Sequence, residues 1–197
     1  KALPALVAGN TVVLKPASLA PISSYHLVNA LVDAGLPAGV LNMVTGPGST
    51  VGAEIATNPR VKAVSFTGSN ATGSRLYDEV TGRNAKCQCE MGGKNPVIVL
   101  ADADIERAVK EVIAGAMFST GQKCTATSRV MVEEAVAAEF TDLLVEKVSA
   151  LTVGNGQQEG VQIGPAVDQA QLDNILEYIE IGKNEGAELL TGGERLT

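Results

Sequence analysis

A cysteine at position 124 has a sequence environment that is unusual for a buried thiol. It lies in the stretch STGQKCTATSR (119–129), directly after a lysine and before threonine, alanine and serine. A core cysteine normally has apolar neighbours, whereas a nucleophilic thiol needs solvent access and groups that favour its thiolate. Helix termini and nearby cations lower the pKa of a thiol and so favour its thiolate, and Lys123 is adjacent in sequence. Cys124 is therefore a candidate nucleophile.

A carboxylate at position 90 is the second candidate for chemistry. Glu90 ends an alternating run in CQCEMGGKNP (87–96) and is followed closely by Gly92 and Gly93. A period of two places Glu90 on the strand face opposite Cys87 and Cys89. The glycines allow a ligand to approach the backbone. Without further context, an ordinary salt-bridged carboxylate is the favoured interpretation of Glu90.

A thiol and a carboxylate base, combined with a nicotinamide cofactor, suit the oxidation of an aldehyde to an acid. The thiol adds to the carbonyl carbon, and hydride then leaves that carbon for the nicotinamide. Water activated by the carboxylate hydrolyses the resulting thioester.

Two glycine-bearing turns are candidates for phosphate binding. In FTGSNATG (66–73) a strand runs into Gly68 and Ser69 before a helix, and the N-H groups at a helix N-terminus favour a phosphate. The stretch GPGSTVG (46–52) resembles the dinucleotide-binding pattern G-x-G-x-x-G but has one residue more than that pattern. Taken alone it predicts a turn and a capped helix, and Gly48 is its candidate cofactor contact.

The strand TVVLK (11–15) bears on the choice of cofactor. It ends at Lys15, Ser18 follows three residues later, and no acidic residue occurs before Asp33. An NAD site usually offers a carboxylate to the ribose hydroxyls, whereas the 2′-phosphate of NADP prefers a cation. We therefore expect NADP to be accepted, with NAD as the other possible cofactor.

These residues require a scaffold, and the first half of the chain predicts one. Short β-branched runs alternate with glycine turns and helical stretches. The predicted strands are 11–15, 41–44, 63–67 and 86–90, and the predicted helices are 22–34, 50–56 and 73–80, with Gly35 and Gly82 at helix C-termini. This alternation predicts an α/β fold with a doubly wound, Rossmann-like and mostly parallel sheet. Ligands bind outside the carboxyl ends of such strands, where the segments after these four strands should gather.

The pattern changes near Pro96, where a second α/β domain is expected to begin. We assign residues 1–95 to part of a nucleotide-binding domain and 96–197 to part of a catalytic domain. In the second part, Asp102 and Asp104 favour the start of a helix. After Cys124 we predict a strand at 130–132, helices at 135–151 and 169–184, and a glycine-rich connector at 154–164.

Composition excludes several classes of partner. The formal charge is −7, from 15 basic and 22 acidic residues, and no basic cluster suits a nucleic acid. The chain has no run of about 18 apolar residues and does not open on a signal peptide, which predicts a cytoplasmic location without membrane binding. Three cysteines indicate reduced thiols. Cys87 and Cys89, with His26 remote in sequence, are predicted to be strand residues rather than metal ligands.

Four motifs in order give the chain a family resemblance. GNTVVLKPAS, FTGSNATG, EMGGKNP and GQKCTATSR resemble the aldehyde dehydrogenase superfamily in order and approximate spacing, over essentially the whole chain. The resemblance implies that Cys124 is the nucleophile and Glu90 the general base. It assigns cofactor contacts to the adenosine ribose side (Lys15, Ser18), to the pyrophosphate turn (Gly68, Ser69) and to the neighbouring turns (Gly48, Gly92). Many NAD-preferring relatives have glutamate at the position of Ser18, which agrees with the expectation of NADP.

The resemblance also implies an oligomer and an incomplete site. Family members have an oligomerisation arm and form dimers or tetramers, so a homo-oligomer is expected. The family's upstream Pro-Trp-Asn-Phe and downstream Glu-x-Phe-Gly-Pro segments have no counterpart here. Since losing one oxyanion donor costs roughly 100- to 1,000-fold in turnover, we expect this segment alone to be inactive and its parent to be an enzyme.

The motifs are most similar to those of dehydrogenases for 2-oxoglutarate semialdehyde (2,5-dioxopentanoate), followed by those for succinate semialdehyde. Two alternatives remain open. One is a relative that transfers the acyl group to coenzyme A, although Glu90 favours water. The other is a truncated, non-catalytic nucleotide-binding fragment.

Overall fold

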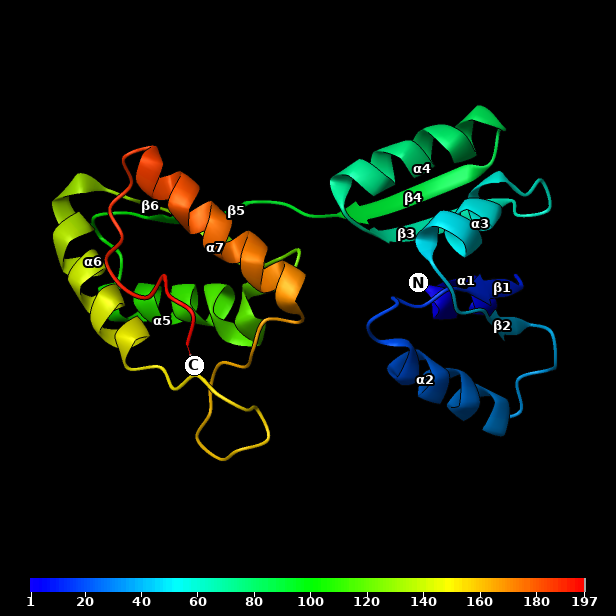
Figure 1. Cartoon of the computed structure of the whole chain (residues 1–197), viewed down its shortest axis with the longest axis horizontal. Coiled ribbons are helices and arrows are strands. Elements are labelled where there is room, and N and C mark those ends of the chain that lie inside the picture. The colour runs from blue at the N-terminus through cyan, green and yellow to red at the C-terminus, as the bar shows by residue number, and fades with distance from the viewer. Residues whose placement is uncertain (197) are drawn as a thin grey trace. The chain divides into compact units, whose positions relative to one another are not determined.

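The computed structural model describes residues 1–196 and contains two compact units (Figure 1). The first unit comprises Lys1–Met91, and the second begins at Gly92. The elements of the first unit are α1 (Ala2–Val7), β1 (Val12–Leu14), α2 (Pro21–Asp33), β2 (Leu41–Met43), a π-helical turn η1 (Gly48–Gly52), α3 (Ala53–Thr57), β3 (Ala63–Gly68), α4 (Asn70–Gly82) and β4 (Lys86–Met91). Those of the second are β5 (Asn95–Val99), α5 (Ile105–Ala116), a 3-10 turn η2 (Phe118–Gly121), β6 (Thr127–Val132), α6 (Glu134–Ser149) and α7 (Gln169–Asn184).

All three strand pairs are parallel, which confirms the predicted α/β class. The pairs are β1–β2, β3–β4 and β5–β6, and each forms its own two-stranded sheet. The first unit therefore contains two short ladders in place of one continuous four-stranded sheet. Adjacent carboxyl ends follow from the register within each pair: Thr67 lies opposite Glu90, and Leu14 lies opposite Met43.

The larger apolar core lies in the second unit. Val99, Val109, Val112, Ile113 and Phe140 form a buried cluster between the β5–β6 pair and the helices α5 and α6. The spacing of the valines and the isoleucine places them on one face of α5, as its sequence predicts. This cluster anchors both the end of α5 and the strand β6, between which Cys124 lies.

A smaller core holds the first unit's second ladder. Helix α4 packs on β3 and β4 (Figure 1), and Val64 and Val80 are buried there with Ala56 of α3. The guanidinium of Arg83 fastens α4 to α3 and its following loop. Its Nε donates to the Ala56 carbonyl at 2.6 Å, and a terminal nitrogen donates to the Val61 carbonyl at 2.7 Å.

The two predicted glycine C-caps differ in outcome. Gly35 adopts a φ of +93° just after α2, as expected for a left-handed helix stop. The prediction for Gly82 is wrong, because Gly82 is the last residue of α4 and the left-handed position falls on Asn84, with a φ of 58°. Asparagine tolerates this conformation better than most residues because its short polar side chain bonds locally.

In the described part of the chain, no helix is both long and apolar enough to cross a bilayer.

The predicted helix start near Asp104 is confirmed. Its carboxylate accepts a hydrogen bond from the Arg107 amide at 3.0 Å and caps α5. The last predicted helix, 169–184, coincides with α7.

This cap gives a test of how α5 is held. Asp104→Ala is expected to lower the free energy of local opening of α5 by about 1 kcal/mol, because an N-terminal amide loses its acceptor. Asp102→Ala is the matched control, since Asp102 lies outside the helix, and its effect should stay below about 0.5 kcal/mol. Amide hydrogen exchange across α5 measures both, and equal effects would contradict the assignment of the cap.

Candidate functional site

The Cys124 thiol is exposed on a tight turn. The turn is closed by a hydrogen bond from the Ala126 amide to the Lys123 carbonyl, at 3.1 Å, and β6 begins one residue later. Cys124 is free and solvent-accessible. The structure therefore presents this thiol to approaching reagents, as the sequence environment suggests.

The backbone just before this turn is in a rarely used conformation. Ser119, Thr120 and Gly121 have φ values of 57°, 55° and 65°. The left-handed region is uncommon for serine and threonine. A side chain at Gly121 would meet the Ala116 carbonyl oxygen at 2.7 Å, so glycine is required there. This sharp reversal leads the chain from α5 back toward β6.

Two side chains that the sequence analysis did not single out fasten the turn to β5. The Asn95 amide nitrogen donates to the Cys124 carbonyl at 2.7 Å and to the Ala126 carbonyl at 3.2 Å. In the other direction, the Arg129 guanidinium donates to the Lys94 carbonyl, with its Nε at 3.2 Å and a terminal nitrogen at 2.9 Å. Both residues lie inside the motifs EMGGKNP and GQKCTATSR, but only the fold shows which carbonyls they contact.

Cys87 and Cys89 differ sharply from Cys124. Their side chains are half-buried on the core-facing side of β4, with the two sulfur atoms 3.7 Å apart. Burial first, and then the hydrogen bond and charge of Cys89, raise the pKa of the Cys87 thiol to about 11. Cys87 also packs against the Val64 and Val80 cluster. These two thiols act as small core residues.

Glu90 lies on the solvent-facing side of β4, as the period-two pattern predicts. Lys86, Gln88 and Glu90 are exposed, in alternation with the half-buried cysteines. The Gln88 amide donates to a Glu90 carboxylate oxygen at 3.3 Å. The carboxylate is thus available to water at the carboxyl end of β4.

The predicted phosphate turn lies beside that strand end. Gly68 ends β3 opposite Met91, and Ser69 caps α4 by accepting a hydrogen bond from the Thr72 amide at 3.3 Å. A Cβ at Gly68 would lie 2.4 Å from the Phe66 ring, so a side chain there would displace that ring. Strand pairing therefore brings the pyrophosphate candidates Gly68 and Ser69 to the same edge as Glu90.

The remaining cofactor candidates occupy other turns. Lys15 follows β1 and donates from Nζ to the Pro16 carbonyl at 2.8 Å, while Ser18 is exposed in the turn before α2. Gly48 begins η1, which has no side-chain cap, in contrast to the capped helix predicted there. Gly92 is exposed at the start of the second unit. Cys124 belongs to this second unit, and Glu90 belongs to the first.

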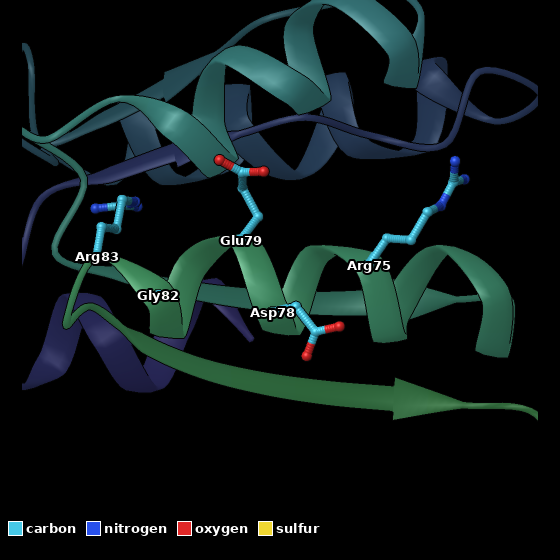
Figure 2. A pocket seen from close by; sticks show the side chains of 5 residues that line it. All are labelled: Arg75, Asp78, Glu79, Gly82 and Arg83. Carbon is cyan, nitrogen blue, oxygen red and sulfur yellow. The ribbon is translucent and has the colours of Figure 1, made fainter.

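A surface hollow of about 680 Å³ in the first unit is lined by none of these candidates. It lies on α4 and is lined by Arg75, Asp78, Glu79, Gly82 and Arg83 (Figure 2). Figure 2 shows that Asp78 points away from the side of α4 on which Glu79 and Arg83 lie. None of the residues that line this hollow is a candidate for catalysis or cofactor binding.

Comparison with known proteins gives consistent matches over the chain. The model of the aldehyde dehydrogenase family matches residues 1–197. The alpha-ketoglutaric semialdehyde dehydrogenase of Bacillus subtilis is 52% identical over 196 residues, which cover 100% of this chain and 40% of that protein. The 2,5-dioxopentanoate dehydrogenase of Saccharolobus solfataricus is 46% identical over 195 residues, which cover 98% of this chain and 41% of that protein.

Solved structures agree. An NADP dependent enzyme of E. coli superposes with a TM-score of 0.95 at 40% identity, covering 98% of this chain and 40% of that one. A betaine aldehyde dehydrogenase of Staphylococcus aureus, in complex with NAD+ and with a BME-modified cysteine, gives a TM-score of 0.97 at 33% identity. The match covers 100% of this chain and 40% of that one. The chain spans about 40% of the length of these relatives.

The contrast between the cysteines predicts selective alkylation. With iodoacetamide at pH 8, Cys124 is expected to react at least about ten times faster than Cys87, because a thiol with a pKa of about 11 is only about 0.1% thiolate at that pH. Peptide mass spectrometry over time gives both rates. Unfolding in urea should abolish the difference, and equal rates in the folded protein would contradict the assignment.

Proposed function

This chain belongs to the aldehyde dehydrogenase family, and we propose that the protein carrying it oxidises an aldehyde to a carboxylic acid with NAD(P)+ through an acyl intermediate on Cys124. The observation that carries the proposal is the exposed Cys124 thiol, presented on a turn that side chains fasten to β5. Such a turn leaves the sulfur free to react while its backbone is held.

The proposed reaction uses Cys124 as the nucleophile. Its thiolate attacks the aldehyde carbon, forming a carbon–sulfur bond and a thiohemiacetal. A bound NAD(P)+ would supply the hydride acceptor, and loss of hydride from the oxyanion of the thiohemiacetal would leave a thioester on Cys124. Glu90 takes a proton from water, which attacks the thioester and releases the acid with the regenerated thiolate.

The cofactor fits the residues at the carboxyl ends of the first unit's strands. The first turn of α4 follows Gly68 and Ser69 in the chain. Its backbone N-H groups suit a pyrophosphate. The Lys15 ammonium uses one proton on the Pro16 carbonyl and has others for a phosphate or ribose oxygen. Together with Ser18 in place of an acidic residue, this supports NADP as well as NAD. The same assignment makes 1–95 part of the nucleotide-binding domain and 96–197 part of the catalytic domain.

The proposed substrate is a short semialdehyde such as 2-oxoglutarate semialdehyde. Two of the relatives named above are called dehydrogenases of alpha-ketoglutaric semialdehyde and of 2,5-dioxopentanoate, which support this class. We propose that the whole protein is a cytoplasmic homo-oligomer, a dimer or a tetramer.

Replacing the nucleophile tests the proposal most directly. In the whole protein, Cys124→Ala is expected to lower aldehyde oxidation by roughly 1,000-fold or more, because no covalent intermediate can form. NAD(P)H formation with 2-oxoglutarate semialdehyde measures this loss. Cys89→Ala is the matched control and should keep its turnover, since Cys89 faces the core. Retained turnover in Cys124→Ala would overturn the mechanism.

The role of Glu90 is tested by the fate of the acyl group. Glu90→Gln is expected to slow deacylation by roughly 100-fold or more, so that a burst of NAD(P)H precedes slow turnover. Rapid-quench mass spectrometry should show the acyl adduct on Cys124, while Glu79→Gln on α4 should show none. An unchanged deacylation rate would remove Glu90 from the role of base, whereas turnover that requires coenzyme A would favour an acyl-transferring relative.

A further inference from the structure

We propose that Asn95 is a positioning residue for Cys124. Its side-chain amide holds the turn that carries the thiol in the orientation that turnover requires. The inference rests on the proposed function but concerns a residue that the proposed chemistry does not itself use. It is drawn from contacts inside the second unit.

The side-chain nitrogen of Asn95 donates to two carbonyls of the turn, those of Cys124 and Ala126. Its nitrogen lies 2.7 Å from the Cys124 carbonyl and 3.2 Å from the Ala126 carbonyl. A side-chain amide has two N-H donors, so both are used on this turn. The turn's own backbone supplies one further bond, from the Ala126 amide to the Lys123 carbonyl. Asn95 is thus the principal side-chain support of the residue that carries the thiol.

The strand ladder cannot replace this support. Asn95 pairs with Thr127, and the next residue, Pro96, pairs with Arg129, so Ser128 is an extra residue on β6. A bulge of this kind interrupts the ladder and redirects the strand. Proline cannot donate a ladder hydrogen bond either. At this end of the β5–β6 pair, side-chain bonds from Asn95 and Arg129 therefore supplement an interrupted ladder.

A second side chain completes a reciprocal clamp. Arg129 on β6 donates two bonds to the carbonyl of Lys94, the residue that precedes Asn95. The two side chains thus cross between the strands in opposite directions, one toward the cysteine turn and one away from it. The clamp holds the turn, which leads into β6, against the start of β5.

The segment before Cys124 adds to the need for an external support. Ser119 and Thr120 are held in the left-handed region, which non-glycine residues adopt only when the surroundings impose it. Without the amide of Asn95, this segment could relax and rotate the Cys124 side chain. A displacement of about 1 Å of a reacting group can cost on the order of 100-fold in rate. The predicted effect is therefore on the chemical step rather than on substrate binding.

The test replaces Asn95 by aspartate, which has the same shape and no N-H donor. In the whole protein, Asn95→Asp is expected to lower kcat by roughly 10- to 100-fold, with KM for the aldehyde changed by less than about twofold. Hydrogen exchange of the 122–127 peptide should accelerate by about tenfold. Asn42→Asp is the matched control, because the Asn42 amide donates a similar bond, to the Gly39 carbonyl at 2.8 Å, in the first unit.

The outcomes separate the two proposals. A loss of kcat together with faster exchange at the turn, both absent in Asn42→Asp, supports the positioning role. Unchanged kcat and exchange would overturn it, as would a loss that merely follows a lower melting temperature and a raised KM. If Asn95→Asp does not fold, Asn95→Ala removes the donors without adding a charge. If the unaltered protein oxidises no aldehyde, the proposed function fails, while the exchange of the turn still decides whether Asn95 holds it.

Discussion

The burial of Val99, Val109 and Phe140 between the β5–β6 pair and its two helices is the interaction on which the cysteine turn depends. Each of these side chains is 2% exposed, and burying such a side chain contributes about 1.5–3 kcal/mol. This cluster anchors α5 and β6, the two elements that flank the turn. Because the core fixes both ends, the loop between them can adopt a strained conformation and still have a defined position.

The same residue type serves two purposes in this chain, and its surroundings decide which. Cys87 and Cys89 face the core of the first unit, where desolvation keeps the Cys87 proton in place. Cys124 lies on a turn in solvent, held through its carbonyl oxygen and not through its sulfur. A side chain that is fixed through its backbone keeps its functional atom free, which suits a nucleophile.

The first unit shows how parallel pairing gathers groups with complementary chemistry. The register of β3 with β4 places the helix-capping turn of Gly68 and Ser69 beside the exposed carboxylate of Glu90. The pairing of β1 with β2 brings the segment that carries Lys15 beside the end of β2 in the same way. In folds of this kind ligands bind outside the carboxyl ends of the strands, and the proposed cofactor contacts lie there.

The sequence by itself determined the identity of most elements and their limits to within a few residues, the alternation of faces on β4 and a helix start at Asp102 or Asp104. These features depend on neighbours a few residues apart, so that periodicity and capping preferences encode them. It also singled out Cys124 by its polar surroundings, and Glu90 by its place at a strand end before two glycines and by the family resemblance. Local preference was not enough at the end of α4, where Asn84 and not Gly82 takes the left-handed position.

Only the tertiary structure decided which groups support the cysteine and how the strands combine. The Asn95 amide meets carbonyls 29 and 31 residues away, and Arg129 reaches back 35 residues. Contacts over such separations depend on the register of β5 with β6 and on its bulge, which no local pattern specifies. The division of the first unit's strands into two ladders likewise follows from packing, because strand periodicity defines faces but not neighbours.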